Sequence, residues 1–541
     1  MTQSAGSGAL IFRGRTASPG FARGPLVRAD QAQVGCRKPG SCQEEERALR
    51  RALAATNGQI SALASAIGGD AAEILEFQLA LLEDESLLEP IFAAIAGGTP
   101  ADKAWSQCLA EQITDYRARP DEYLQARCVD VTDLRDRVLA ALNGGASGLG
   151  RVPASAVVCA EDLPPSRFLE IDWSAGGGLA LLQGSPTSHV AMLARARGVP
   201  MIVQLGEVPD NEATALLDGG QATLELDPSA SRIADFEDRR EAHARDSATA
   251  RILLAGPPVA WRGETVQLYI NIQGLADLSH PDAHYADGIG LMRTEFLFDD
   301  PAGLPDEETQ FRVYETVLRW AGDRPVTIRT VDAGGDKPIR GFTEDGEANP
   351  FLGVRGLRLC LKHPEIFAVQ LRALGRAAVQ GKLKVMFPMV TVPAEFAAAC
   401  DLFHRVVDDL RAARLPAALP ELGIMVEVPA AALTIEAFPA AFFSIGSNDL
   451  AQYVTACDRT NGALGALIDP LNPGVLELIR RTAHHGTRHG ISVSLCGDMA
   501  GDPRCAAALL NCGLREFSMS PPSLARVKQA IAALSSEGSG D

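Results

Sequence analysis

Long apolar runs are absent from this 541-residue sequence. No window approaches the roughly 18 uninterrupted apolar residues that indicate a membrane-spanning helix. Residues Met1 to Leu10 contain neither the basic stretch nor the apolar stretch of a secretory signal peptide. We therefore expect a cytoplasmic protein without membrane insertion.

Paired cysteines, a surplus of positive charge and a dinucleotide-binding glycine motif are also missing. The 11 cysteines are an odd number and form no C-x-x-C pair, which argues against a disulfide framework and a structural zinc site. Lys and Arg number 50 against 68 Asp and Glu, and the net charge of −18 disfavours nucleic acid as a partner because its phosphates would be repelled. No G-x-G-x-x-G follows an early predicted strand, so a dinucleotide-binding sheet is not expected.

The composition does contain enough apolar material for several folded domains, with 46% hydrophobic and 22% charged residues. Residues 1–28 and 146–228 carry short β-branched runs separated by Gly and Pro, whereas residues 29–145 show helical spacing. The spacing predicts helices over residues 44–67, 71–88, 101–116 and 121–142. We therefore predict an α/β domain made from both flanks of an inserted all-helical subdomain.

A second pattern follows a charged helical stretch at residues 229–255, which we expect to be a linker helix. Residues 256–541 alternate short apolar strands with helices, which is typical of a closed (β/α)8 TIM barrel. An open doubly wound sheet is the structural alternative. The eight predicted strands cover residues 266–271, 288–292, 326–331, 384–388, 423–428, 442–445, 492–495 and 516–519.

Charged side chains follow several of these strands, where a barrel places its reactive groups. Arg293, Arg329 and Arg459 suit the phosphate and carboxylate oxygens of a small, multiply charged anion, because guanidinium groups bind such oxygens in pairs. Glu427 and Asp449 form a hard oxygen site suited to Mg²⁺, which favours few protein carboxylates plus substrate oxygens and water. A single charged residue at a strand end is as often part of a surface ion pair as part of a binding site. The prediction therefore rests on the number of such residues.

Two further features accompany these charges. Lys337 follows Gly334 and Gly335, which let the backbone approach a ligand closely. Cys496 comes directly after the seventh predicted strand. A lone cysteine there is more often a small buried hydrophobe, but beside a metal-bound enolate its thiol could deliver or remove the carbon proton.

A second candidate site surrounds His189. A Thr or Ser cap precedes this histidine, and Gly198 followed by Pro200 ends the short helix that begins there. Unpaired backbone amides at a helix start stabilise added negative charge. The imidazole could attack phosphorus, and the phosphohistidine would be held by those amides and by Arg195. The alternative is that His189 is a capping or core residue.

Seven spaced strings occur in order along the chain, at residues 186–189 (PTSH), 290–298 (GLMRTEFLF), 334–337 (GGDK), 349–355 (NPFLGVR), 427–429 (EVP), 444–450 (SIGSNDL) and 495–497 (LCG). Through them the sequence resembles enzyme I of the bacterial phosphoenolpyruvate-dependent sugar phosphotransferase system, over essentially its whole length. So many spaced matches exclude coincidence.

The resemblance implies a swivelling phosphohistidine domain at residues 1–28 and 146–228 and a helical insert at 29–145 that docks a carrier protein. The barrel at 256–541 would bind phosphoenolpyruvate and form a homodimer. Phosphoenolpyruvate with Mg²⁺ would phosphorylate Nε2 of His189, which would pass the phosphoryl group to a small histidine-containing phosphocarrier protein for sugar uptake.

The same resemblance implies a role for each strand-end residue. Glu427 and Asp449 would hold the metal, and Cys496 would protonate the enolate to give pyruvate. The residues that would bind phosphoenolpyruvate are Arg293, Arg329, Lys337, Arg355, Asn448, Asp449 and Arg459.

Three positions depart from the family pattern: Ser185 replaces a second glycine, Val190 replaces a frequent Thr, and Pro164 stands where the family tends to carry a hydroxyl residue that can bond the histidine. Three other functions are alternatives. A nucleotide-dependent dikinase would need an ATP-binding domain, for which the sequence has no glycine-rich phosphate loop. A carbon–carbon lyase on a metal barrel would have no use for His189. A regulatory phosphorelay paralogue that signals nitrogen or carbon status stays open.

Overall fold

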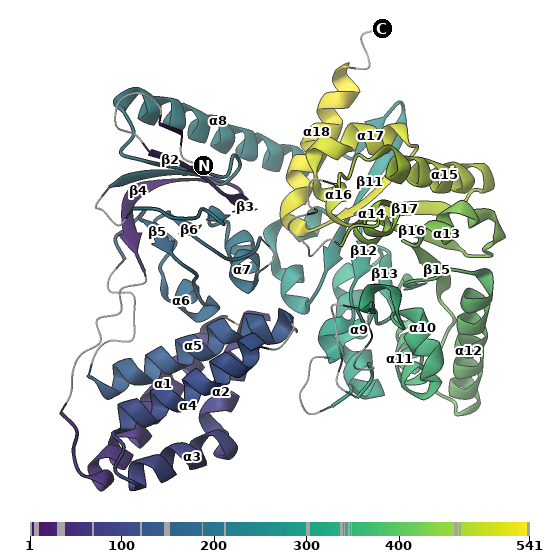
Figure 1. Cartoon of the computed structure of the whole chain (residues 1–541). Helices are drawn as coiled ribbons and strands as arrows, with labels where there is room; N and C mark the ends of the chain where they lie inside the picture. Colours follow the sequence, from purple (N-terminus) through teal and green to yellow (C-terminus); the bar gives the residue numbers. More distant parts are fainter. Residues whose placement is uncertain are drawn as a thin grey trace. The chain divides into compact units, whose positions relative to one another are not determined.

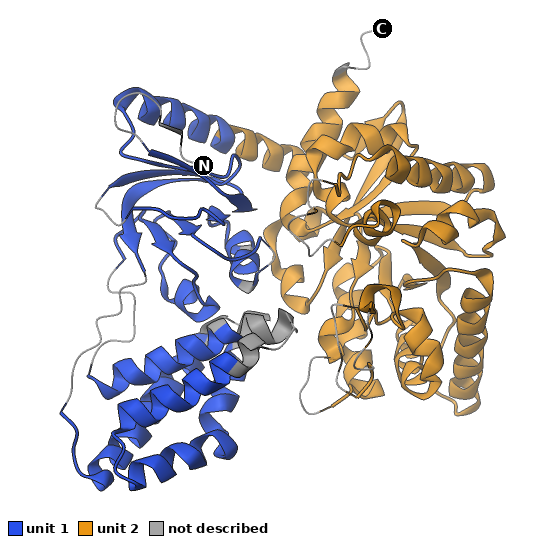
Figure 2. Ribbon diagram, viewed as in Figure 1, with its two compact units in different colours: residues 1–244 blue, residues 245–541 orange. Residues whose placement is uncertain are grey.

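A computed structural model describes residues 3–4, 10–29, 38–67, 70–118, 122–144, 152–186, 188–209, 213–298, 303–335, 339, 341–343, 347, 349–458, 464 and 467–537. The chain divides into two compact units, residues 1–244 and 245–541 (Figure 2). Within these described residues, no helix is both long and apolar enough to cross a membrane.

Unit 1 contains a mixed sheet whose strand order is β1-β2-β9-β8-β4-β5-β6-β7-β3. Strand β4 pairs with β8 antiparallel on one side and with β5 parallel on the other, so a segment before the helical insert lies between segments that follow it. This arrangement confirms the predicted α/β domain with an insert. The strands are β1 (Gln3–Ser4), β2 (Leu10–Arg13), β3 (Arg15–Ser18), β4 (Phe21–Arg28), β5 (Val157–Ala160), β6 (Gly178–Leu181), β7 (Met201–Val203), β8 (Thr214–Asp218) and β9 (Thr223–Leu226).

The insert is helical, as predicted (Figure 1). Its helices are α1 (Cys42–Ile67), α2 (Asp70–Glu83), α3 (Glu85–Ala96), α4 (Ala101–Ala118) and α5 (Glu122–Leu142). The helix predicted over residues 71–88 is wrong in its last part, because helix α2 ends at Glu83 and a new helix begins after Asp84. The Asp84 carboxylate accepts a hydrogen bond from the Ser86 backbone at 2.8 Å and thereby caps the new helix α3.

A buried ion network connects the insert to the α/β domain. The Asp133 carboxylate on α5 accepts hydrogen bonds from Nε of Arg137 at 2.7 Å and from Nε of Arg167 at 2.9 Å, the latter on α6 (Pro165–Glu170). Ser166 donates to Asp133 at 2.5 Å, and Arg137 donates to Glu170 at 2.5 Å. Burial favours the neutral carboxyl, but the two guanidinium groups and the hydroxyl outweigh it and hold the pKa of Asp133 below its usual range.

Helix α8 (Ala230–Leu254) is anchored at its two ends by different contacts. Near its start, Arg232 donates to Glu225 of β9 at 2.6 Å. At its end, Leu254 belongs to the core of unit 2, and Nζ of Lys528 donates to its carbonyl at 3.0 Å. The intervening residues 244–249 are mostly exposed.

Unit 2 is a parallel barrel closed by the pairing of its first strand with its last, Gln267 opposite Glu516. Closure excludes the open-sheet alternative and confirms the predicted TIM barrel. The barrel strands are β11 (Glu264–Ile272), β12 (Ile289–Met292), β13 (Val326–Arg329), β14 (Leu383–Phe387), β15 (Glu421–Val426), β16 (Phe442–Gly446), β17 (Ser492–Cys496) and β18 (Glu516–Met519), and β10 (Val259–Trp261) pairs antiparallel with β11. All eight predicted strands are present, with ends within two residues of the prediction.

Helices surround the barrel strands (Figure 1). They are α9 (Glu307–Ala321), α10 (Leu357–Lys362), α11 (Pro364–Ala377), α12 (Pro393–Ala412), α13 (Pro429–Leu433), α14 (Ser447–Thr455), α15 (Pro473–His489), α16 (Asp498–Gly501), α17 (Ala506–Asn511) and α18 (Leu524–Glu537). Short 3-10 helices are η1 (Leu275–Ser279), η2 (Pro281–Tyr285), η3 (Glu295–Phe298), η4 (Pro350–Leu352), η5 (Ile435–Ala437), η7 (Pro503–Cys505) and η8 (Pro521–Ser523).

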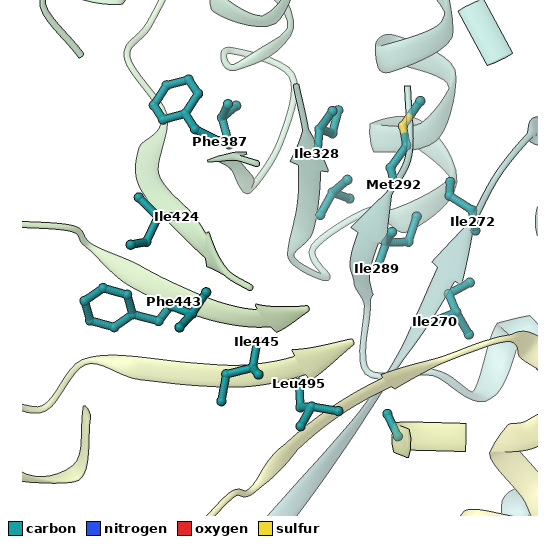
Figure 3. Close-up of a cluster of buried hydrophobic side chains, with 14 of the residues drawn as sticks. Ile270, Ile272, Ile289, Met292, Ile328, Phe387, Ile424, Phe443, Ile445 and Leu495 are labelled. Carbon is teal, nitrogen blue, oxygen red and sulfur yellow. The ribbon is translucent and has the colours of Figure 1, made fainter. Parts of the chain in front are cut away.

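The two faces of the barrel wall carry different side chains. Phe387, Ile424 and Phe443 belong to the large apolar core between strands and helices (Figure 3). Their neighbours in sequence point the other way, because successive strand residues alternate between faces. A separate small cluster inside the barrel contains Leu291, Met386, Met425, Phe442 and Cys496. At the end of each strand, the residues that share the inward-facing side with this cluster are therefore the ones whose side chains reach the mouth of the barrel.

Candidate active site

Arg329, the last residue of β13, lies among buried acidic groups at the barrel mouth. Its guanidinium donates to Glu295 at 3.1 Å and is 3.2 Å from a carboxylate oxygen of Asp332. Burial disfavours the charge, but the surrounding carboxylates outweigh it and raise the pKa of Arg329. Its Nε is buried and has no hydrogen-bond partner among the described residues. This donor remains available for an anionic ligand.

Glu427 follows β15 directly and is 1% exposed. One carboxylate oxygen accepts a hydrogen bond from the backbone N–H of Met389 at 2.7 Å. Met389 adopts φ +56°, an unusual conformation for a side-chain-bearing residue, at the position where this N–H is needed. The other oxygen lies against Gly446, where an added Cβ would be only 2.8 Å away. The Glu427 carboxylate is therefore held in one place.

Asp449 lies in the first turn of α14, beyond the end of β16. One of its oxygens is 3.6 Å from the guanidinium of Arg355. The same guanidinium donates hydrogen bonds to the Asp332 carboxylate at 2.9 Å and to the Tyr453 hydroxyl at 3.3 Å. Arg355 is itself buried, so these contacts fix Asp449 relative to Asp332. The proposed contact of Arg355 with a substrate stays a prediction.

The carboxylates of Glu427 and Asp449 fit the predicted metal. Burial raises the pKa of Glu427, and the neighbouring charges of Asp449 and Asp332 raise it further, so a cation would relieve their repulsion. In the described part of the chain, no three His, Cys, Asp or Glu side chains form a ready metal cluster. A pair of carboxylates with substrate and water as the remaining ligands suits Mg²⁺.

Cys496 ends β17 with its thiol inside the barrel and buried. Its sulfur accepts a hydrogen bond from the Ser444 hydroxyl at 3.6 Å and lies 3.6 Å from the Ile445 carbonyl. Burial raises the pKa of this thiol, although Ser444 and the positive charges of Arg329 and Arg293 oppose the rise. The thiol is therefore kept in its protonated form, as a general acid requires.

Arg293 and Asn448 lie at the same end of the barrel but follow different strands, β12 and β16, which are not paired with each other. Arg293 follows β12, and within the described residues its guanidinium has no ion-pair partner. Asn448 follows Ser447 at the start of α14, and its side-chain oxygen accepts a hydrogen bond from the Asp498 backbone at 3.0 Å. This contact orients the Asn448 amide.

Two predicted substrate ligands, Lys337 and Arg459, lie outside the described residues. His189 is the first residue of α7 (His189–Arg197), and only its backbone is described. The cap is Ser188, whose hydroxyl accepts from the Ala191 backbone at 3.3 Å. At the other end Gly198 adopts the left-handed conformation at φ +65°. Both predicted helix ends are confirmed, and the helix start at His189 with them.

Three residues of the barrel site carry no role in the sequence-based prediction: Glu295, Asp332 and Tyr453. Glu295 accepts from the Asp332 backbone at 2.9 Å as well as from Arg329. Tyr453 donates to the Phe351 carbonyl at 2.5 Å. The sequence could have indicated Asp332, because it is an acidic residue only three positions after Arg329. Nothing in the sequence indicates a role for Tyr453.

Family models cover most of the chain. The model described as the PEP-binding domain of PEP-utilising enzymes matches residues 248–536, more than half of the chain. The chain belongs to the PEP-utilising enzymes. The N-terminal domain of this family matches residues 13–127, and its mobile domain matches residues 152–227.

Curated PEP-utilising enzymes are similar over nearly the whole sequence. A phosphoenolpyruvate-protein phosphotransferase of Geobacillus stearothermophilus is 36% identical over 97% of this chain and 93% of that protein. One of Bacillus subtilis is 33% identical over 97% of this chain and 95% of that protein. A multiphosphoryl transfer protein of Xanthomonas campestris pv. campestris is 36% identical over 95% of this chain, but the chain spans only 62% of its length. This PEP-utilising enzyme is a phosphotransferase.

Proposed function

We propose that the chain transfers the phosphoryl group of phosphoenolpyruvate to His189 and from there to a histidine-containing phosphocarrier protein that serves sugar uptake. The observation that carries this proposal is at the mouth of the barrel, where a buried arginine whose Nε has no hydrogen-bond partner among the described residues lies beside two crowded carboxylates. The similarity to phosphoenolpyruvate-protein phosphotransferases supports the same reaction.

The substrate is held by side chains from several strand ends. Arg329 and Arg293 bind phosphate and carboxylate oxygens, with Asn448, Lys337, Arg355 and Arg459 as further ligands. Guanidinium groups fix the orientation of a planar carboxylate because each can donate two parallel hydrogen bonds. Glu427 and Asp449 would hold Mg²⁺, which would supply positive charge to neutralise the negative charge that develops on the substrate oxygens.

The transfer breaks the bond between phosphorus and the enol oxygen and forms a bond between phosphorus and Nε2 of His189. The enolate that leaves takes a proton on its terminal carbon from the Cys496 thiol, which gives pyruvate. The raised pKa of Cys496 keeps that proton available. The position of His189 at the start of α7 supports the intermediate, because unpaired backbone amides there stabilise the added negative charge.

One imidazole cannot contact the barrel and a carrier protein at the same time, so the phosphohistidine domain must move. Helix α8 is suited to such a swivel, because its ends are anchored while residues 244–249 are mostly exposed. We assign carrier docking to the helical insert and homodimer formation to the barrel, both on the family resemblance.

The second candidate function is a regulatory phosphorelay with the same chemistry and a different carrier.

Labelled phosphoenolpyruvate with Mg²⁺ should place acid-labile, base-stable phosphate on the wild type and none on His189→Ala. His484→Ala, which removes an exposed histidine of α15, is the matched control and should label normally. Label on His189→Ala would overturn the relay. Incubating the labelled wild type with sugar-type and nitrogen-type carriers then shows which carrier accepts the phosphoryl group.

A further inference from the structure

Four polar side chains are fully buried between the barrel wall and helices α9 and α11: Thr294, Gln310, Tyr314 and Gln370. The surrounding core is apolar. Burying hydrogen-bonding groups in such surroundings is costly unless each finds a partner, and apolar side chains would pack there without that requirement. We call these four residues the hydrogen-bond relay.

The relay is continuous. The Gln370 oxygen accepts from the Val331 backbone N–H at 3.0 Å, and its amide nitrogen donates to the hydroxyls of Thr294 and Tyr314, each at 3.2 Å. Because a backbone N–H can only donate, the orientation of the Gln370 amide is fixed. Tyr314 donates to Gln310 at 3.1 Å, and Gln310 donates to the Pro305 carbonyl at 3.1 Å.

The inner end of the relay holds two strand ends together. The Thr294 hydroxyl donates to the Arg329 carbonyl at 3.0 Å, and Thr294 lies directly after Arg293 in the chain. Gln370 meanwhile binds Val331, two residues beyond Arg329. The backbones that carry Arg293 and Arg329 are therefore joined through one hydroxyl and one amide.

We infer that Thr294 and Gln370 are positioning residues that set the spacing between Arg293 and Arg329, and so the fit of the barrel mouth to a small, multiply charged anionic substrate. This inference rests on the proposed function, since it takes phosphoenolpyruvate as that substrate. Binding by two guanidinium groups depends on placement to a fraction of an ångström, so a shift of one strand end weakens it.

Three variants separate positioning from stability. Thr294→Val removes the inner hydroxyl at constant size, and Thr294→Ser retains it. Tyr314→Phe removes a hydroxyl of the same relay farther from the strand ends and reports the cost of losing the two buried hydrogen bonds of that hydroxyl. If Thr294→Val does not fold, Thr294→Ala makes the same deletion without adding a methyl group beside Gln370.

The measurement is the dissociation constant of phosphoenolpyruvate with Mg²⁺, determined by calorimetry in full-length protein that also carries His189→Ala, so that binding does not lead to transfer. We expect Thr294→Val to weaken binding roughly tenfold or more, Thr294→Ser to restore it to within about twofold, and Tyr314→Phe to lower the melting temperature with little change in binding.

Unchanged binding by Thr294→Val, or equal weakening by Thr294→Val and Tyr314→Phe, would overturn the positioning role. If the His189→Ala parent bound no phosphoenolpyruvate, the proposed function itself would fail. The two failures are therefore distinguishable.

Discussion

Single backbone positions shape the barrel mouth as much as its charges do. Gly334 adopts φ +99°, and an added Cβ would lie 2.7 Å from Cβ of Arg355. Only glycine accepts both the conformation and the close approach at this position. Arg355 in turn contacts Asp332 and Asp449. By allowing Arg355 to pack closely against the backbone, Gly334 helps to keep these two carboxylates in place.

Gly334→Ala should therefore destabilise the barrel and weaken phosphoenolpyruvate binding. We expect a loss of about 2–4 kcal/mol in unfolding free energy, from the strained backbone and the steric overlap together. Gly263→Ala is the matched control, because Gly263 has a similar φ of +83° but open space around the added Cβ; it should cost about 1 kcal/mol. Denaturant unfolding of both variants checks this, and equal losses would contradict the proposed contact.

The strand-end residues could be predicted from the sequence, whereas their mutual contacts could not. Arg329, Glu427 and Cys496 each come at the end of a short apolar run, and a barrel brings such ends to one rim. The pairing of Arg355 with Asp332 depends on how the intervening loop folds back, which no local pattern records. The sequence also did not show that the thiol of Cys496 points into the barrel, because this orientation depends on which face of the strand the residue occupies.

At the scale of elements, the ion network between α5 and α6 shows how differently two acidic residues of one helix can act. Asp133 is buried and shared by two arginines, whereas Asp136 forms a surface pair with Arg135 at 2.8 Å. Removing one partner of a buried pair leaves an uncompensated charge, which is far more costly than losing a surface pair.

Asp133→Asn should lower the unfolding free energy by about 3–5 kcal/mol at neutral pH, and Asp136→Asn by less than about 1 kcal/mol. Because the network lowers the pKa of Asp133, its contribution is fully present above the usual aspartate pKa and is lost as the pH falls through the lower folded-state value. The stability difference between wild type and Asp133→Asn should therefore shrink in acid. Thermal unfolding at several pH values tests this, and a difference that grew on acidification would contradict it.

The alternation of strands and helices made the barrel predictable, whereas strand β6 and the start of α3 were not predicted. The barrel strands alternate with helices, so their positions were confirmed to within two residues. Strand β6 (GLAL) is buried along its whole length and contains no β-branched residue, so it shows neither alternation nor strand propensity. The start of α3 depends on the two hydrogen bonds that the Asp84 carboxylate accepts from Ser86, and the apolar spacing of residues 71–88 does not reveal them.

At the scale of the whole molecule, the chain consists of two units with separate apolar cores. Separate cores can unfold independently, and a ligand that binds one unit stabilises only that unit unless the two are coupled. The residues of the proposed barrel site, Arg329, Glu427, Asp449 and Cys496, all belong to unit 2.

Calorimetry of His189→Ala should therefore show two unfolding transitions. Phosphoenolpyruvate with Mg²⁺ at a hundredfold excess over its dissociation constant should stabilise one of them by about 2.7 kcal/mol and leave the other unchanged. Adding Asp133→Asn should lower the transition that the ligand does not move. A single transition, or a ligand effect on both, would show that the two units unfold as one.

The pairing of β11 with β18 has a consequence for synthesis. Gln267 and Glu516 lie about 250 residues apart, so a ribosome adding roughly 5–20 residues per second completes the partner of the first barrel strand on the order of 10–50 s after that strand emerges. The sheet of unit 1 is complete in sequence by Leu226 and can form during this interval. The nascent protein thus passes through a period in which one half can be finished while an unpaired strand edge of the other is exposed to aggregation or chaperones.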